Sequence, residues 1–297
     1  MYALETNNLT KKFKDKVVVN NINLNVPKGS IYGFLGKNGA GKSTFINMVT
    51  GISIPTSGNI KLNSTLSKVG VLPDYSSFYD NLNAEEHLKY FSNILGHKIT
   101  NEEIKTILIN VGLDISNKTK VKNYSFGMKK KLGIAQTLIN NPDIIFLDEP
   151  TSGVDPNSIL TIHNLIRKLS KDGKTIFLTS HNLDEVEKLC DTIAIMDKGN
   201  ILIEGSLKDI KRNYQNVIEV TYKIKCENID IKYLINNRMS KYSTNIRYNK
   251  DQIILDTTNY DTIAEINELL VNHQVKVFGI NVYEPTLEEI FINTGSK

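Results

Sequence analysis

A glycine-rich loop between an apolar run and a helical pattern constrains this chain more than any other feature of its sequence. The loop directly follows the apolar residues Ile31 to Leu35 and fits the pattern GxxxxGK[ST]. Glycines let backbone N–H groups close around phosphate oxygens, and a helix that begins near Lys42 directs the positive end of its dipole at them. The sequence therefore predicts a strand, a phosphate-binding loop and a helix in succession.

The side chains of this loop favour a nucleotide site over a plain glycine-rich turn, which is the alternative. Lys42 is expected to neutralise phosphate charge, and the Ser43 hydroxyl is expected to bind Mg²⁺. ATP and Mg²⁺ are the predicted cofactors. The predicted nucleotide-binding residues of the loop are Gly36, Lys37, Asn38, Gly39, Ala40, Gly41, Lys42, Ser43 and Thr44.

A second candidate site element is an apolar run that ends in two carboxylates. Residues Ile144 to Leu147 are followed by Asp148 and Glu149. Asp148 is expected to bind Mg²⁺ through water, and Glu149 to orient or deprotonate the attacking water. An acidic strand end alone is often only a helix cap, but the glycine-rich loop in the same chain favours the catalytic interpretation.

Apolar patterning predicts two sheets in the N-terminal part of the chain. Alternating residues such as Ile22 to Val26 and Asn59 to Leu62 are typical of half-buried strands, which we expect in a small antiparallel sheet. Continuous apolar runs are typical of strands covered on both faces and predict a mainly parallel central sheet. These runs are Ile31 to Leu35, Val69 to Leu72, Ile144 to Leu147, Thr175 to Leu178 and Ile193 to Met196.

Helical periodicity after Leu72 predicts helices inserted into this α/β core. One helix is expected around Ala84 to Leu95, and Thr100 with Glu103 forms a capping box at the start of another. Beyond the acidic strand end, Asp155 is the expected N-cap of a helix with proline at its first position.

Residues 122–129 resemble the signature of the ABC ATPase family, which commonly reads LSGGQ. The chain keeps Ser125 and Gly127 but has Tyr124, Phe126 and Met128 at the other places. The resemblance implies that Ser125, Gly127 and the following helix N-terminus complete the nucleotide site of the opposite subunit. Judged without the family, Ser125 is a plain helix N-cap.

The resemblance extends to three further places. Residues Ser152 to Asp155 are similar to the D-loop of the family, and His181 stands where the family has its switch histidine, which implies a role at the γ-phosphate. Phe13, expected ahead of the first strands of the small sheet, stands where an aromatic ring usually stacks on adenine. The alternatives are a structural histidine at a strand end and a half-buried strand residue.

Asp74 departs from the family pattern, which usually has glutamine at this place. The position implies that Asp74 approaches the Mg²⁺-bound water or the attacking water, so the candidate metal-site residues are Ser43, Asp74 and Asp148. The alternative is a loop residue after Pro73 that faces solvent. The departure concerns how Mg²⁺ binding is coupled to a membrane partner, and nucleotide binding is still expected.

The resemblance implies a fold and a function. The fold is an α/β P-loop NTPase with a RecA-like core, an antiparallel β subdomain and a helical subdomain at about residues 75–140, all within residues 1–213. The function is that of an ATP-binding and ATP-hydrolysing subunit that forms a homodimer or pairs with a related subunit and powers a membrane-spanning permease. The alternative is a soluble ABC-type ATPase of translation or DNA maintenance. Such proteins carry two cassettes or long coiled coils, whereas this chain has one cassette and no sustained heptads.

Residues 216–297 show alternating strands and short helices without a glycine-rich loop, which predicts a small α+β accessory domain. We expect it to be regulatory or to support dimerisation, because it carries no catalytic constellation. Residues Glu284 to Phe291 resemble the ending of the drug- and antibiotic-exporter branch of the family, including bacitracin- and lantibiotic-resistance ATPases, and imply an exporter. The alternative is a terminal helix with a capping box of Thr286 and Glu289.

Composition bears on three further classes of protein, those that span a membrane, bind nucleic acid or bind zinc. No run approaches the roughly 20 apolar residues that cross a bilayer, so we expect a cytoplasmic protein, held at the inner face of the cell membrane by its permease. The net charge of +4 is spread along the chain, and no nucleic-acid partner is expected. Cys190 and Cys226 lack zinc-ligand spacing and are expected as reduced thiols. Four histidines match no motif and are expected on helix or loop surfaces, namely His87, His97, His163 and His273.

Overall fold

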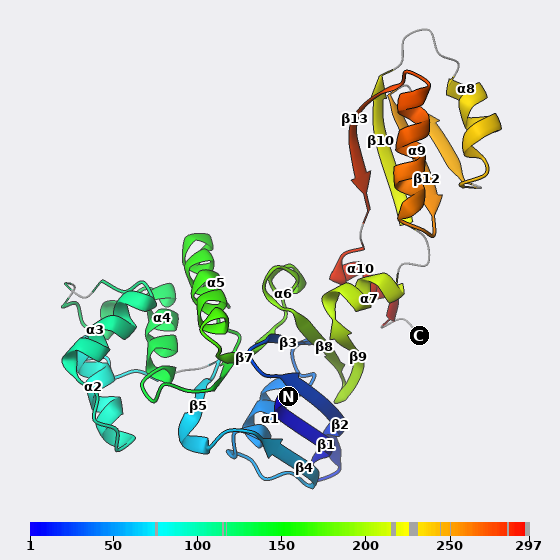
Figure 1. The fold of residues 1–297 in the computed structure, drawn as a ribbon. Coiled ribbons are helices and arrows are strands. Elements are labelled where there is room, and N and C mark those ends of the chain that lie inside the picture. The colour runs from blue at the N-terminus through cyan, green and yellow to red at the C-terminus, as the bar shows by residue number, and fades with distance from the viewer. Residues whose placement is uncertain are drawn as a thin grey trace. The chain divides into compact units, whose positions relative to one another are not determined.

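The computed structural model of the chain divides into two compact units, Met1–Leu207 and Lys208–Lys297 (Figure 1). The structure describes residues 1–74, 77–114, 116, 118–214, 218–225, 231–243, 245–249, 251–283 and 285–294. Cys226, Glu284 and residue 216, the predicted start of the accessory domain, lie outside the described residues. The predicted domain boundary near residue 213 stays a prediction.

A six-stranded sheet forms the centre of the first unit. Its strands, in spatial order, are β5 (Val69–Leu72), β6 (Ile144–Asp148), β7 (Thr175–Ser180), β3 (Ile31–Leu35), β8 (Thr192–Asp197) and β9 (Asn200–Ser206). The first five run parallel, as the apolar runs predict, and β9 pairs antiparallel with β8. Every residue of β3, β6 and β7 is buried, because elements on both sides cover these strands.

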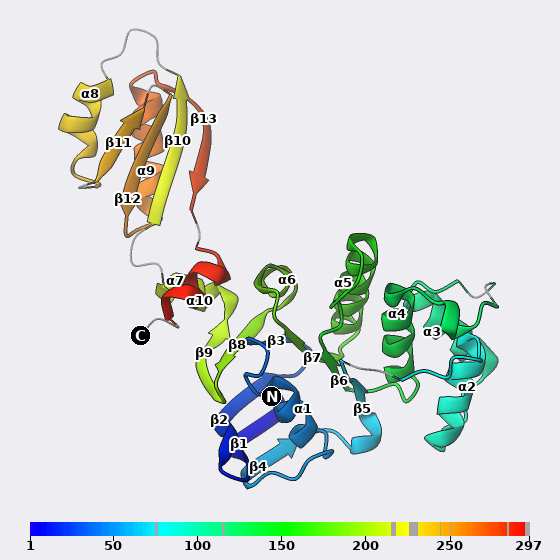
Figure 2. The same cartoon turned by 180° about the vertical axis from the view of Figure 1, so that it is seen from behind.

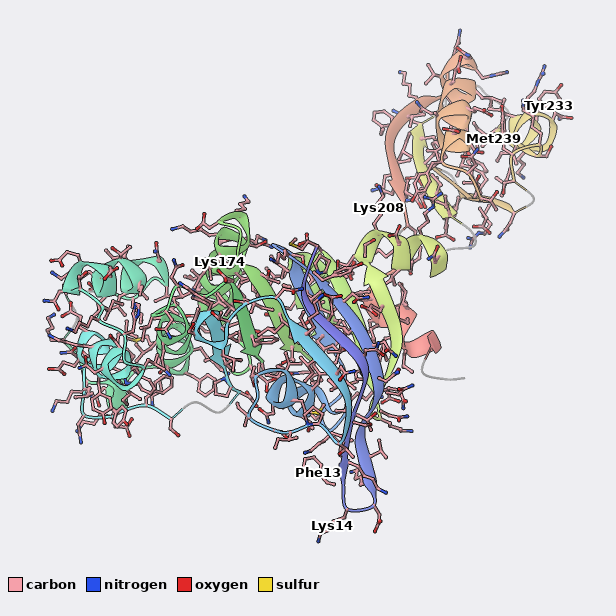
Figure 3. The ribbon with its side chains drawn as sticks, turned by 60° about the horizontal axis from the view of Figure 1, so that its bottom comes forward. Phe13, Lys14, Lys174, Lys208, Tyr233 and Met239 are labelled. Carbon is pink, nitrogen blue, oxygen red and sulfur yellow. The ribbon has the colours of Figure 1, made fainter. Side chains whose placement is uncertain are left out.

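A three-stranded antiparallel sheet confirms the predicted small sheet. It consists of β2 (Lys16–Pro27), β1 (Tyr2–Phe13) and β4 (Ser57–Leu62) in this order. The expectation that Phe13 precedes these strands is wrong, because Phe13 is the last residue of β1 and pairs with Lys16 across the β1–β2 hairpin. Figure 3 shows Phe13 and Lys14 at the end of this hairpin.

The core of the first unit joins the two sheets and α1 (Lys42–Val49). Aromatic rings from three elements meet in it: the Tyr32 and Phe177 rings stack with centroids 5.5 Å apart, and the Phe45 ring of α1 lies 4.9 Å from that of Phe34. Such buried rings supply much of the apolar area that stabilises a fold. The helix after the glycine-rich loop is therefore anchored by its buried face, which includes Phe45, Ile46 and Met48.

The inserted helices are α2 (Ala84–Ile94), α3 (Asn101–Asn110) and α4 (Phe126–Thr137), which gather at one end of the unit in both views (Figures 1 and 2). The predicted capping box of Thr100 and Glu103 is confirmed at the start of α3. Asp155 caps α5 (Pro156–Lys171), also as predicted, and its side chain accepts from the Ser158 N–H. The unit also contains α6 (Leu183–Leu189) and short 3₁₀ turns at Leu66–Lys68 and Val121–Asn123.

The second unit has a core of its own. Its four-stranded antiparallel sheet has the order β11 (Ile246–Asn249), β12 (Gln252–Thr257), β10 (Ile218–Lys225) and β13 (Lys276–Val282). Alternate residues of β10 pack with α9 (Asp261–Asn272), α8 (Ile231–Leu234) and the π-helical turn Ile235–Met239. The remaining helices near the ends of this part of the chain are α7 (Leu207–Tyr214) and α10 (Leu287–Thr294). Among the described residues, no helix is both long enough and apolar enough to cross a bilayer.

Candidate functional site

The glycine-rich loop lies between β3 and α1, where neighbouring backbone comes so close that side chains do not fit. A Cβ at Gly36 would lie 2.4 Å from the Met196 carbonyl oxygen, and one at Gly41 would lie 2.5 Å from that of Val18. Gly41 also has a φ of 113°, which residues with a Cβ rarely adopt. These two glycines are therefore needed by the loop conformation itself, before any ligand is considered.

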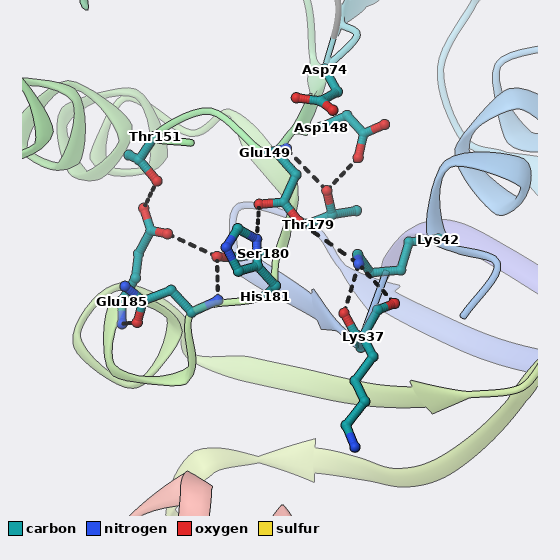
Figure 4. Close-up of polar contacts among 12 residues, drawn as sticks. Lys37, Lys42, Asp74, Asp148, Glu149, Thr151, Thr179, Ser180, His181 and Glu185 are labelled. Carbon is teal, nitrogen blue, oxygen red and sulfur yellow. Dashed lines mark hydrogen bonds and ion pairs between the residues drawn. The ribbon is translucent and has the colours of Figure 1, made fainter. Parts of the chain in front are cut away.

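Lys42 is turned back over this loop and is 6% exposed. Its Nζ donates to the Gly36 carbonyl at 2.7 Å and to the Lys37 carbonyl at 3.5 Å, as Figure 4 shows. The same amine lies 3.7 Å from Glu149 Oε1. A single cation thus faces both the loop and the acidic end of β6.

Asp148 and Glu149 leave β6 in two different environments, and Thr179 of β7 bonds to both. The Thr179 Oγ1 donates to Asp148 Oδ1 at 2.5 Å and accepts from the Glu149 N–H at 3.1 Å. Asp148 is buried. Sequence patterning did not single out Thr179, although a polar residue at the end of an apolar run is a usable signal.

Glu149 combines a strained backbone with a partly paired carboxylate. Its φ of 51° lies in the left-handed region, which is costly for a residue with a Cβ and is common at functional sites. The Oε2 atom lies 2.8 Å from His181 Nδ1. The buried Oε1 atom has no hydrogen-bond partner among the described residues. We call Lys42, Asp148, Glu149, Thr179 and His181 the Glu149 cluster.

A pocket of about 200 Å³ brings most of the predicted site residues together. Its lining consists of Val18, Asn38, Gly39, Ala40, Gly41, Lys42, Ser43, Thr44, Asp74, Asp148 and Glu149. The other predicted site residues are not part of this lining, although His181 contacts Glu149, and Lys42 contacts the Gly36 and Lys37 carbonyls. The residues outside the lining are Phe13, Gly36, Lys37, Ser125, Gly127 and His181. The predicted convergence of loop and carboxylates is thus found in one molecule, while the predicted roles of these side chains stay predictions.

The predicted signature residues lie at the start of α4. Ser125 is the N-cap, and its Oγ accepts from the Met128 N–H at 3.2 Å. A Cβ at Gly127 would lie 2.8 Å from Ser158 Oγ, so this glycine allows α4 to approach the start of α5. Phe126 between them is 56% exposed. Phe13 is also largely exposed, and the Lys11 amine lies 4.9 Å from its ring centroid.

Asp74 lies on the segment that follows β5 and faces the pocket, with 35% of its side chain exposed. Its carboxylate Oδ1 lies 3.6 Å from the Nζ of Lys130, a buried lysine of α4 that the sequence patterns did not identify. Burial lowers the pKa of Lys130, while the carboxylates of Asp74, Asp148 and Glu149 act in the opposite direction. A second buried lysine besides Lys42 therefore lies beside the candidate site.

A second buried cluster surrounds Glu185 of α6. Its Oε1 accepts from Thr151 Oγ1 at 2.6 Å and lies 2.9 Å from His163 Nε2, and its Oε2 accepts from Ser180 Oγ at 2.9 Å. Burial raises the pKa of Glu185, but the hydrogen bonds from His163, Thr151 and Ser180 outweigh it, so the net pKa is lowered. We call Thr151, His163, Ser180 and Glu185 the Glu185 cluster.

The expectation of surface positions is wrong for two of the four histidines. His163 is 6% exposed because it pairs with Glu185, and His87 is fully buried beside Gln136, whose Oε1 lies 3.1 Å from its Nε2. Both lie on the inner faces of helices, α5 and α2. A histidine without a motif offered no sequence signal for these contacts. Cys190 is buried and has no disulfide partner among the described residues, which do not include Cys226, so the reduced state of both thiols stays a prediction.

The donor set around the pocket fits a magnesium ion that also contacts phosphate. Among the described residues, no group of three or more His, Cys, Asp or Glu side chains could hold a metal ion by itself. Mg²⁺ commonly takes one or two carboxylates together with substrate phosphates rather than a complete protein cage. Ser43 and the two carboxylates Asp74 and Asp148 line the same pocket and can supply such ligands.

Known proteins with similar sequences and folds are ATP-binding transport proteins. The family model described as ABC transporter matches residues 19–152. The chain is 33% identical to the bacitracin transport ATP-binding protein BcrA of Enterococcus faecalis over 98% of this chain and 95% of that protein. It is 39% identical to the lantibiotic transport ATP-binding protein SrtF of Streptococcus pyogenes over 68% of this chain and 90% of that protein.

A solved dimeric bacterial ABC transporter cassette matches at 25% identity with a TM-score of 0.62, covering 69% of this chain and 98% of that one. These matches confirm the resemblance and the P-loop fold that the motifs predicted. They do not favour the alternative of a soluble ATPase acting in translation or on DNA, because the matched proteins are named for transport.

Proposed function

Because the chain belongs to the family of ATP-binding subunits of ABC transporters, we propose that its pocket binds ATP with Mg²⁺ and that Glu149 activates the attacking water. The subunit is an ATPase that works as a dimer and powers a membrane-spanning permease. The observation that carries the proposed residue roles is the convergence of Lys42, Asp148 and Glu149 on one pocket.

Lys42 and the loop Gly36 to Thr44 bind the phosphates in this proposal. The Lys42 amine already lies over the loop carbonyls, and phosphate oxygens would replace those carbonyls as its acceptors. The N-terminus of α1 adds N–H groups that have no partner within the helix, together with the positive end of the helix dipole. Ser43, Asp148 and Asp74 are the proposed metal-site residues, and bound Mg²⁺ neutralises negative charge on the phosphates.

Glu149 is the proposed general base. One carboxylate oxygen is held by His181, and the other has no hydrogen-bond partner among the described residues, which leaves it as an acceptor for a water proton. Glu149 takes that proton while the water oxygen bonds to the γ-phosphorus and ADP leaves. If His181 carries its proton on Nδ1, it donates to Oε2 and holds the carboxylate in one orientation.

The remaining predicted contacts come from Phe13 and from a second copy of the subunit. Ser125 and Gly127 at the N-terminus of α4 complete the nucleotide site of the opposite subunit, and Phe13 stacks on adenine. The exposed Phe126 ring beside the cap would then contact the opposite subunit as well.

Dimer formation by a hydrolysis-deficient variant tests these roles together. Glu149→Gln should bind ATP and accumulate as a closed dimer, which light scattering measures directly. Lys42→Ala is the control and should stay monomeric with ATP, because it lacks the cation that holds the phosphates. A Glu149→Gln protein that turns over ATP at the parental rate would show that the assignment of the base is wrong.

The transported compound is proposed to be a drug, an antibiotic peptide or a similar compound, exported from the cell. Support comes from relatives named for bacitracin, lantibiotic and linearmycin transport or resistance. The subunit would then lie at the inner face of the membrane, held by its permease. Cells that lack it should be more sensitive to bacitracin or a lantibiotic, and the parent protein, but not Glu149→Gln, should restore growth. Equal sensitivity with and without the subunit would remove this substrate class.

A further inference from the structure

A buried lysine joins α4 to the two segments that carry Asp74 and Glu149. Lys130 is 6% exposed and lies in the middle of α4. Burying an ammonium group is unfavourable unless the group is paired and hydrogen-bonded. Its contacts must therefore offset the loss of hydration.

The helix face that carries Lys130 otherwise allows very close packing. Gly127 and Gly133 lie three residues before and after Lys130, on the same side of the helix. A Cβ at Gly133 would lie 2.6 Å from the Leu72 side chain of β5, and one at Gly127 would lie 2.8 Å from Ser158. Lys130 is thus the long side chain between two points of close approach, and it extends to the ends of β5 and β6.

The Lys130 amine contacts both strand ends at once. Its Nζ donates to the Glu149 carbonyl at 2.9 Å and to the Asp74 carbonyl at 3.2 Å, and it lies 3.6 Å from Asp74 Oδ1. An ammonium group has three N–H donors; two of them bond to backbone carbonyls, and the Asp74 carboxylate lies within ion-pair distance. The contacts connect a helix, the segment after β5 and the residue proposed as the general base.

Among the groups that Lys130 contacts, the Glu149 backbone has the least favourable conformation. A left-handed φ of 51° persists only when the surroundings hold it. Thr179 accepts from the Glu149 N–H at 3.1 Å, and Lys130 donates to the carbonyl of the same residue. The peptide groups on both sides of the strained position are therefore anchored, and the direction of the carboxylate follows from them.

We propose that Lys130 is a positioning residue for ATP hydrolysis, which fixes the backbone of Glu149 and the carboxylate of Asp74 in one arrangement. This inference rests on the proposed role of Glu149 as general base and adds a link between that residue and α4. Because Ser125 caps α4 and Gly127 lies in its first turn, a shift of this end of the helix reaches Glu149 through the Lys130 amine. Asp74 acts in this arrangement as the counter-ion of Lys130 as well as a residue of the pocket.

The test compares the ATPase kinetics of the full chain with those of three variants. Lys130→Met removes the charge and the donors at similar length, Lys130→Gln keeps an N–H donor group, and Lys131→Met is the matched control on the neighbouring position of α4. We expect Lys130→Met to lower kcat about 10- to 100-fold, because small misplacement of a catalytic group has effects of that order. The KM for ATP should change by no more than about threefold, because the phosphate-binding loop is untouched.

Lys130→Gln should give a kcat between those of the parent and Lys130→Met, and Lys131→Met should match the parent. The contact with Asp74 is tested by combining Asp74→Ala with Lys130→Met. If the two side chains act together, the loss of kcat in the double variant is smaller than the product of the two single losses. Thermal unfolding of each protein confirms that kinetics are compared on folded chains.

Parental kcat in both Lys130→Met and Lys130→Gln would overturn the inference, and so would a rise in KM alone. If the loss of kcat in the double variant equals the product of the two single losses, Lys130 does not act through the Asp74 carboxylate. Measuring the parent and Glu149→Gln in the same assay distinguishes an error about Lys130 from an error in the proposed function. If Glu149→Gln hydrolyses ATP like the parent, the assignment of Glu149 as the general base is wrong. If Glu149→Gln is inactive and both Lys130 variants are parental, only the role of Lys130 is wrong.

Discussion

The Glu149 cluster and the Glu185 cluster are built on consecutive residues of β7, yet they pair their carboxylates differently. Thr179 bonds to Asp148 and to the Glu149 backbone, while Ser180 donates to Glu185. Successive side chains of a strand point to opposite faces, so one strand end serves both clusters (Figure 4). In the Glu185 cluster both carboxylate oxygens accept hydrogen bonds, whereas Glu149 Oε1 has none among the described residues.

This difference indicates that the Glu185 cluster stabilises the fold and that the Glu149 cluster acts on a ligand. A fully hydrogen-bonded buried carboxylate rigidifies its surroundings, and Glu185 links the segment after β6, α5 and the end of β7. An incompletely paired carboxylate on a strained backbone is disfavoured in the unliganded protein and is typical of a functional site. Replacing each carboxylate by the isosteric amide should therefore damage different properties.

The largest expected effect is on turnover in Glu149→Gln. General bases typically contribute about 10²- to 10⁴-fold, so kcat should fall by that order while ATP affinity stays close to parental. Steady-state phosphate release and equilibrium ATP titration measure the two quantities. Such assays scatter by roughly twofold. A kcat within that range of the parental value would show that Glu149 is not the catalytic carboxylate, and the proposed difference in role between the two clusters would be lost.

The next effect concerns the cation of the Glu149 cluster. Lys42→Ala should weaken ATP binding about 10- to 100-fold, since hydrogen bonds to charged groups contribute about 1.5–3 kcal/mol. Titration with ATP measures this change, and Lys89→Ala, an exposed lysine of α2, serves as the control. If both variants bind ATP equally well, Lys42 does not hold the phosphates.

Glu185→Gln should act mainly on stability. The amide cannot accept at both positions, so Thr151, His163 or Ser180 loses a partner in a buried site, and the free energy of unfolding should fall by about 1–3 kcal/mol. Denaturant unfolding followed by circular dichroism measures the loss. Glu149→Gln should show no comparable loss, because Oε1 has no hydrogen-bond partner among the described residues and the amide oxygen can still contact His181 in place of Oε2. Equal stability of the two variants would contradict the division between the clusters.

Acid pH should weaken the Glu185 cluster in the parent. The folded pKa of Glu185 lies below its ordinary value of 4.5, so its contribution to stability is present above that value and is lost as the pH falls through the folded pKa. The free energy of unfolding measured between about pH 6 and pH 3 should therefore fall less steeply in Glu185→Gln than in the parent. Parallel pH profiles would show that Glu185 does not titrate in this way.

The smallest effect on the site is expected from removal of the C-terminal part. A fragment that ends near residue 213 should bind ATP with parental affinity, because every residue of both clusters lies in Met1–Leu207. The same fragment tests the predicted boundary and the predicted accessory role, since a regulatory or dimer-supporting domain would alter turnover or dimerisation instead. Loss of ATP binding in a well-folded fragment would refute this division.

Much of the fold was predictable because its signals are local. Capping boxes act within four residues, and burial of a strand on both faces requires an apolar run whatever its neighbours are, as in Ile31 to Leu35. The strand order was not predictable in this way, and β9 was missed as the antiparallel edge. Phe13 was misplaced because the length of β1 depends on its pairing with β2 and β4.

In the candidate site, too, local features were predictable from the sequence and contacts between distant residues were not. By itself the sequence determined that a strand, a glycine-rich loop and a helix follow one another, and that a buried strand ends in Asp148 and Glu149, since chain geometry and residue chemistry are enough for both. Only the tertiary structure decided that Lys130 meets the Glu149 carbonyl, that His163 pairs with Glu185, and that Thr179 and Ser180 serve different clusters. These contacts join residues on separate helices and strands, and their partners are set by how closely those elements pack.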